Sequence, residues 1–208
     1  MRTNPLAAAF FAAVFAAVII PAGASPAGAK ARAGVIVNET AAKVERMKSV
    51  LFNLVRQDET LDGVIDKFNS SGSKLSAHEI STLGLTLKTV KGGLDAGSAR
   101  NKKSFSEARP DAALSVYTRT ILSYSHSISR KTAKIGALLA HAALTSKKTA
   151  MRDAVSSKNS GRIQNGKKLT QILEEQQALE RLSADLQALK ASSRKLTATS
   201  KWLDIVSK

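Results

Sequence analysis

The chain has 208 residues and carries 32 Lys and Arg against 16 Asp and Glu, a formal net charge of +16. It contains no cysteine, which excludes disulfide bonds, thiolate nucleophiles and cysteine metal sites. Aromatic residues make up only 4% of the chain, so helices packed through small and aliphatic side chains are favoured over strands.

Residues 1–29 are predicted to be a cleavable secretory signal peptide. Arg2 provides a positive start, and residues 6–20 form an uncharged apolar run followed by small residues that suit cleavage after Ala24 or Ala29. This run is shorter than the ~20 residues that a helix needs to cross a bilayer, although an uncleaved anchor is the alternative. We therefore expect an exported protein with no stable membrane span after cleavage. The absence of cysteine favours a bacterial periplasm or exterior, because secreted eukaryotic domains usually contain disulfides.

Residues 30–208 are predicted to form a single helical-bundle domain, since about 180 residues suffice for one core. The first helix is expected to begin near Asn38, a favourable N-cap residue. Apolar residues then follow alternating three- and four-residue steps, a seven-residue repeat that is broken only at Asp58. The members of this repeat are Val44, Met47, Leu51, Leu54, Leu61, Ile65 and Phe68.

A capping box predicts the start of the second helix. Ser76 and Glu79 stand three residues apart, so that each side chain can bind the other residue's backbone N–H. One face of this helix then carries Ile80, Leu83, Leu87, Val90 and Leu94. Three glycines weaken the helix over residues 91–109, where we expect either a hinge or a frayed helical extension.

The third and fourth helices carry two further apolar stripes. Pro110 suits the first position of the third helix, which is either continuous or broken near Lys131 or Gly136. The polar residues 156–161 are expected to form the turn before the fourth helix. The third stripe comprises Leu114, Tyr117, Ile121, Tyr124, Ile128, Ile135, Leu138 and Ala142, and the fourth Ile172, Leu179, Leu182, Leu186, Leu189, Leu196 and Leu203.

Four amphipathic helices with mostly short connections predict an all-α fold, an elongated antiparallel bundle of up-down-up-down order. The seven-residue repeat indicates left-handed packing at about 20°. If the third and fourth helices are unbroken, the hairpin that joins them should project beyond the other two helices by about 20 Å, at 1.5 Å per residue.

The positive charge is concentrated around this third turn. Residues 112–172 contain eleven Lys and Arg but a single acid, Asp153. Cations and glycine beside a helix N-terminus can bind phosphate or sulfate, whereas the alternative is a solvated lysine-rich surface. The candidate anion-binding residues are Lys147, Lys148, Arg152, Lys158, Arg162, Lys167 and Lys168.

Catalytic and metal-binding motifs are missing from the sequence. His78, His126 and His141 fall on the outer face or flank of their helices, where exposed or boundary histidines are expected. No phosphate loop, nucleophile elbow or paired metal ligands occur, so we expect no enzymatic activity, no cofactor and no metal. Nucleic acid is a disfavoured partner, because no basic run is interleaved with aromatics that could stack on bases.

These features predict a non-enzymatic, exported protein of the cell envelope that binds or scaffolds. Its partner would be an anionic envelope polymer or an acidic protein, contacted through the basic hairpin between the third and fourth helices. The alternative is a structural or chaperone-like protein that acts through an apolar helix face or by dimerisation. Apolar residues beyond the repeats motivate this alternative: Val50, Val55, Val64 and Leu139. The sequence does not indicate the oligomeric state.

Overall fold

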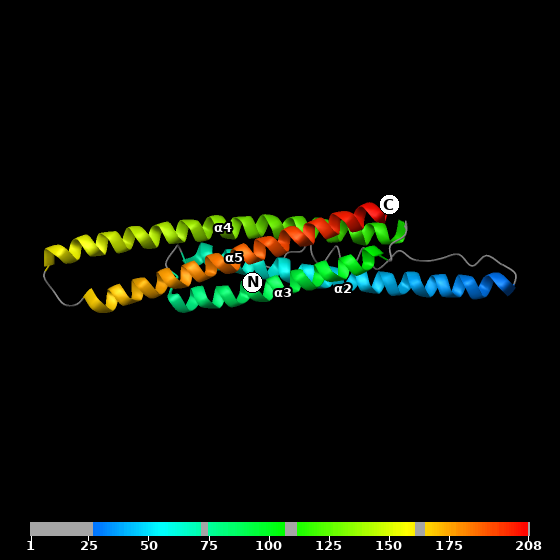
Figure 1. Ribbon diagram of the computed structural model, residues 1–208, viewed down its shortest axis with the longest axis horizontal. Coiled ribbons are helices and arrows are strands. Elements are labelled where there is room, and N and C mark those ends of the chain that lie inside the picture. The colour runs from blue at the N-terminus through cyan, green and yellow to red at the C-terminus, as the bar shows by residue number, and fades with distance from the viewer. Residues whose placement is uncertain (1–26, 72–74, 107–111, 161–164, 208) are drawn as a thin grey trace. The chain divides into compact units, whose positions relative to one another are not determined.

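The structure is a computed structural model that describes residues 27–71, 75–106, 112–160 and 165–207. These residues form four α-helices (Figure 1), α2 (Ala27–Ser71), α3 (Ala77–Ser106), α4 (Ala112–Ser160) and α5 (Asn165–Val206). The prediction of an all-α fold with four helices is confirmed. The chain divides into two compact units, Met1–Thr40 and Ala41–Lys208, and the second unit contains the bundle. Most of the predicted signal peptide, residues 1–26, lies outside the described residues.

Two helices extend beyond their expected ends. The expected start near Asn38 is wrong, because α2 already begins at Ala27, in a segment rich in alanine, the strongest helix former. The expected turn at residues 156–161 is also misplaced, since α4 continues to Ser160. Polar residues lower helix propensity by only a few tenths of a kcal/mol each, whereas the glycine at position 161 is a stronger helix breaker. Neither Lys131 nor Gly136 interrupts α4.

Residues 91–106 are helical, so this segment extends the second helix and contains no hinge. Residues 107–109 lie outside the described residues. Tertiary packing outweighs the low helix propensity of the three glycines in this segment. Leu94 is fully buried, the hydroxyls of Ser98 and Thr199 are 3.4 Å apart, and Asn101 Nδ2 donates to Ser200 Oγ at 3.0 Å. These contacts secure the second half of α3 against α5.

The predicted capping box at the start of α3 is confirmed. The backbone N–H of Ser76 donates to Glu79 Oε2 at 2.9 Å, and the N–H of Glu79 donates to Ser76 Oγ at 3.3 Å. The bond from the Ser76 backbone, followed by the bond from its hydroxyl, lowers the pKa of Glu79. The two backbone N–H groups of the capping box therefore have a partner.

Contacts between α5 and its two neighbours define the helix directions. Along α3 and α5 the paired numbers rise together, from Lys88 with Asp185 to Asn101 with Ser200, so these helices are parallel. Along α4 and α5 the numbers run in opposite directions. Thr118 is hydrogen-bonded to Ser207 and the carbonyl of Ser125 to Thr197, so α4 and α5 are antiparallel.

The helix α2 also contacts two helices. The guanidinium of Arg100 in α3 donates to Ser49 Oγ at 3.1 Å, and Lys131 Nζ in α4 donates to Asp58 Oδ2 at 2.6 Å. Helix directions alternate along the chain, as the up-down-up-down order requires. The helices follow one another around the bundle in the order α2, α3, α5, α4, so that α3 with α5, and α2 with α4, are parallel neighbours.

The core consists mainly of the predicted repeat positions, including Leu54, Leu87, Ile128 and Leu189, all fully buried. It also includes three of the four apolar residues beyond the repeats, since Val50, Val64 and Leu139 are buried, whereas Val55 is half-buried and is not part of the core. A helix that contacts two neighbours buries a wider stripe than a two-stranded coiled coil does. Val50, Val64 and Leu139 therefore provide no free apolar face.

Adjacent glycines in α3 provide a matched test of this packing. A Cβ on Gly92 would meet no atom within 4 Å, whereas one on Gly93 would lie 2.6 Å from Nε2 of Gln57. Gln57 is buried and hydrogen-bonded to Asn53 at 3.1 Å, so its side chain would have to leave that site. We expect Gly92→Ala to raise the free energy of unfolding by about 0.5–1 kcal/mol, and Gly93→Ala to give no gain or a loss. Urea denaturation followed by circular dichroism measures both, and equal gains would contradict the contact with Gln57.

Candidate anion-binding hairpin and adjacent cleft

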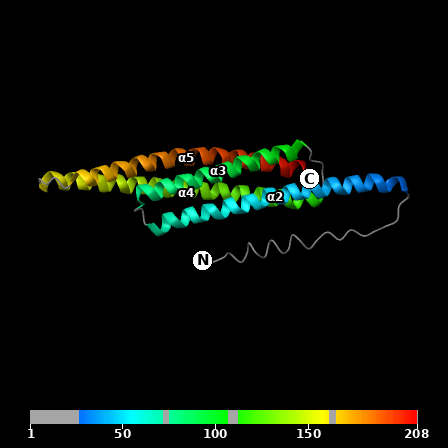
Figure 2. The same cartoon turned by 90° about the horizontal axis from the view of Figure 1, so that it is seen from below.

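The α4–α5 hairpin continues past the end of α2 and the start of α3 (Figure 2). Residues Ala142 to Thr149 of α4 lie level with Leu75, just before α3. From Thr149, α4 continues to Ser160, a further rise of about 16 Å at 1.5 Å per residue. The unbroken helices thus produce the projecting hairpin that their lengths predicted.

The candidate anion-binding residues lie along this hairpin. Lys147, Lys148 and Arg152 are exposed on α4. Three further cations, Lys158 in α4 and Lys167 and Lys168 in α5, belong to the helices, but their side chains lie outside the described part of the structure. Arg162 lies in the segment 161–164, which is outside the described residues altogether. We call residues 147–168 the basic hairpin.

The charged side chains of α4 are almost all positive. Residues 112–152 contain no Asp or Glu, and α4 as a whole contains only Asp153. Cations in the C-terminal half of a helix complement its dipole, so Lys158 is favourably placed, whereas Lys167 and Lys168 oppose the dipole at the N-terminus of α5. A cost of this kind is offset when an anion binds the same N-terminus.

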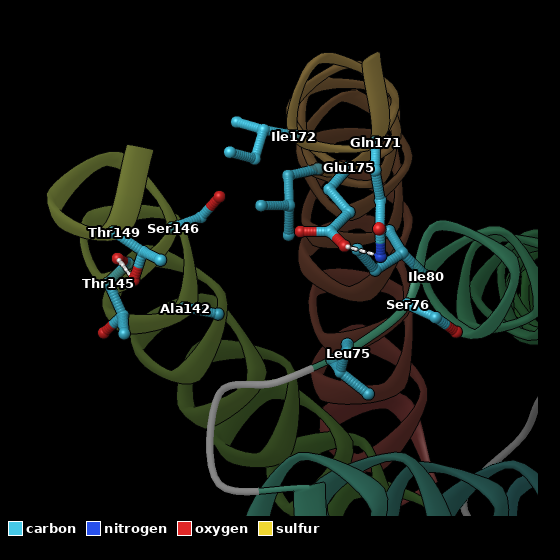
Figure 3. A pocket seen from close by; sticks show the side chains of 11 residues that line it. Leu75, Ser76, Ile80, Ala142, Thr145, Ser146, Thr149, Gln171, Ile172 and Glu175 are labelled. Atoms are coloured by element: carbon cyan, nitrogen blue, oxygen red, sulfur yellow. Dashed lines mark hydrogen bonds between the residues drawn. The ribbon is translucent and has the colours of Figure 1, made fainter. Parts of the chain in front are cut away.

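An open cleft of about 400 Å³ lies where the hairpin leaves the four-helix region (Figure 3). Leu75 forms its floor, α4 and α5 form two walls, and the start of α3 forms the third side. The lining residues are Leu75, Ser76 and Ile80, then Ala142, Thr145, Ser146 and Thr149 from α4, and Gln171, Ile172, Glu175 and Leu179 from α5.

The polar groups of the cleft are mostly engaged within their own helices. The hydroxyls of Thr145 and Thr149 donate to backbone carbonyls one turn earlier, and Gln171 Nε2 donates to Glu175 Oε1 at 3.2 Å. Ser146 points toward the gap between α4 and α5 (Figure 3). Glu175 places a carboxylate on one wall of the cleft, and of the candidate cations whose side chains the structure describes, Lys147, Lys148 and Arg152, none lines it. These three cations and the cleft are therefore separate features.

A partly buried ion pair that was not predicted from the sequence joins α2 to α4. Lys131 Nζ donates to Asp58 Oδ2 and to Asp62 Oδ2, both at 2.6 Å, and to the carbonyl of Asp58 at 3.1 Å. Burial opposes protonation, but these bonds outweigh it and raise the pKa of Lys131. Asp58 is the residue that interrupts the first seven-residue repeat, and this break was the signal that could have found the pair. The ion pair aligns two helices and lies apart from the cleft.

The three histidines are exposed, as predicted. Within the described residues, no group of three or more His, Asp or Glu side chains is placed to hold a metal ion. None of the helices in the same residues is long and apolar enough to cross a bilayer.

Neither a family model, nor a curated protein, nor a solved structure matches this chain. Its function is therefore inferred from geometry and charge.

Proposed function

We propose that this is an exported, non-enzymatic helical bundle that binds anionic partners of the cell envelope through its basic hairpin. The observation that carries the proposal is the concentration of cations at the end of α4 and the start of α5, from the level of Leu75 outward. Phosphate-bearing polymers such as lipopolysaccharide or teichoic acid, or an acidic protein, have the complementary charge.

The distribution of charge supports this function better than the total charge does. A basic surface that served only solubility would not require the cations to gather where α4 is joined to α5, because they repel one another there. The hairpin also contains no aromatic residue between 147 and 168, so it lacks the stacking groups of single-strand nucleic-acid sites. The chemistry therefore favours a flexible or dispersed polyanion over a base-specific ligand.

Four substitutions at the hairpin turn test the proposal. Replacing Lys158, Arg162, Lys167 and Lys168 with Gln should weaken binding to heparin or lipopolysaccharide by about tenfold or more, because fewer counterions are released on binding when these cations are lost. Isothermal titration at ~0.15 M salt, where exposed charges beyond ~8 Å are screened, measures the change.

The matched control removes the same charge elsewhere. Lys102 in α3 and three exposed cations of α5 lie away from the hairpin turn, and all four are replaced with Gln: Lys102, Arg194, Lys195 and Lys201. This variant should bind almost as the wild type does. A wild type that binds neither polymer at this salt concentration would refute the proposed function.

One specific observation still supports the structural or chaperone-like alternative. Trp202 and Ile205 lie three residues apart near the end of α5, and both are more than half exposed. Of the four residues that first motivated this alternative, Val50, Val64 and Leu139 are buried in the core, and Val55 is half-buried. A concentration-independent monomer in sedimentation equilibrium would exclude dimerisation through the Trp202 region.

A further inference from the structure

The side of α4 that does not line the cleft carries exposed apolar side chains. Leu144 is 61% exposed and Met151 is 71% exposed. They stand seven residues apart, so they lie on the same face of the helix, and neither contributes to the cleft. Ala137 and Ala140, both exposed, continue the same stripe toward the N-terminus of α4.

Cations flank this stripe directly. Lys147 and Lys148 follow Leu144 by three and four residues and precede Met151 by four and three, so both lie between the two apolar side chains. Arg152 follows Lys148 by four residues and is also exposed. Residues 112–152 contain no acid, so this helix face has no negative charge of its own, and the exposed His141 also lies on it. We name it the α4 outer face: Ala137, Ala140, Leu144, Lys147, Lys148, Met151 and Arg152.

This combination distinguishes between anionic partners. A soluble polyanion would pair with the lysines and Arg152 but would leave Leu144 and Met151 in water. The surface of an anionic bilayer accepts both kinds of group, because apolar side chains enter the boundary between headgroups and acyl chains while long basic side chains reach the phosphates.

We propose that the α4 outer face binds the surface of an anionic phospholipid bilayer, with Leu144 and Met151 inserted and Lys147, Lys148 and Arg152 on the lipid phosphates. This inference rests on the proposed function, since it uses the same basic hairpin and names its partner. Two large apolar side chains and three cations provide reversible, salt-sensitive binding, and α4 lies along the interface without crossing it.

Vesicle binding of a variant without the apolar groups tests the inference. Leu144→Ser combined with Met151→Ser should lower the affinity for phosphatidylcholine vesicles containing phosphatidylglycerol by about tenfold or more, because less apolar area leaves water. The affinity of the same variant for heparin should not change. Co-sedimentation measures vesicle binding, and pure phosphatidylcholine vesicles provide the uncharged reference.

The matched control replaces exposed apolar residues on other helices, Phe52→Ser in α2 with Leu85→Ser in α3, and should bind anionic vesicles as the wild type does. Unchanged vesicle binding by the Leu144 and Met151 variant would overturn the inference. So would a wild type that binds heparin but not the anionic vesicles, a result that favours a soluble acidic partner and leaves the proposed function intact. A wild type that binds neither refutes both.

Discussion

Leu54→Ala is expected to lower the free energy of unfolding by about 3 kcal/mol. Leu54 is completely buried in α2. A Cβ built on Gly97 of α3 would lie 3.7 Å from Leu54 Cδ2 and 3.5 Å from Leu196 Cδ1 of α5, so three helices meet at this point. Because long helices on several sides cannot all move inward, the cavity left by the substitution should stay largely open.

Urea denaturation followed at 222 nm measures this loss. Leu85→Ala is the matched control, since Leu85 is exposed on α3 and its truncation should change stability by less than about 0.5 kcal/mol. A loss below about 1 kcal/mol for Leu54→Ala would show that α2, α3 and α5 do not pack tightly around this residue.

Lys131→Met should lower the free energy of unfolding by about 2–3 kcal/mol at neutral pH. The reason is the carboxylate left behind, because Asp58 is only 14% exposed and its Oδ1 is already buried without a hydrogen-bond partner. Asp62 is 53% exposed and remains solvated after the substitution. The loss therefore arises mainly from Asp58.

A second substitution separates this cause from a loss of packing. Adding Asp58→Leu restores the apolar repeat of α2 and removes the stranded carboxylate, so the double variant should recover most of the lost stability. A double variant as unstable as Lys131→Met alone would contradict the role assigned to Asp58.

The pH dependence of the same variant has a defined sign. Because the pKa of Lys131 is raised above its ordinary value of 10.5, its stabilising contribution is complete below that pH and disappears as the pH rises through the folded-state pKa. The stability difference between the wild type and Lys131→Met should therefore be constant from pH 7 to about 9 and become smaller above about 10.5. A difference that grows in alkaline solution would contradict this assignment.

Local patterns were sufficient to predict the helices and most of the core. The seven-residue repeats identified Leu54, Leu87 and Leu189 as core residues, and the capping box identified the start of α3. These features depend on residues close together in the sequence. Helix ends were predicted less well. The alanines after Ala27 favour a helix that begins before the expected N-cap at Asn38, and the polar residues before Ser160 are less favourable than good helix formers by only fractions of a kcal/mol.

The order of the helices around the bundle could not be predicted from periodicity. A repeat shows which face of a helix is apolar but not which other helix covers it, so the parallel contacts of α3 with α5 and of α2 with α4 were not foreseen. For the same reason Val50 and Val64 seemed surplus until α2 was found to have two neighbours. The pairing of Asp58 with Lys131 depends on that same arrangement.

The candidate site was predicted in part. Charge counts identified the basic hairpin, and helix lengths identified its projection past α2 and α3. The cleft beside Ile172 was missed, because it exists only where α4 and α5 separate above Leu75. The α4 outer face was missed because Leu144 and Met151 resemble the fading end of a core stripe in the sequence, whereas both are exposed.

The salt dependence of heparin binding tests the central claim most directly. We compare the slope of log K against log salt concentration for the wild type, for the Gln variant of Lys158, Arg162, Lys167 and Lys168, and for the control variant of equal net charge. If the basic hairpin is the anion-binding surface, the hairpin variant should have a clearly shallower slope and the control should keep the wild-type slope. Equal slopes for the two variants would show that only the overall charge matters and would contradict a site at the hairpin.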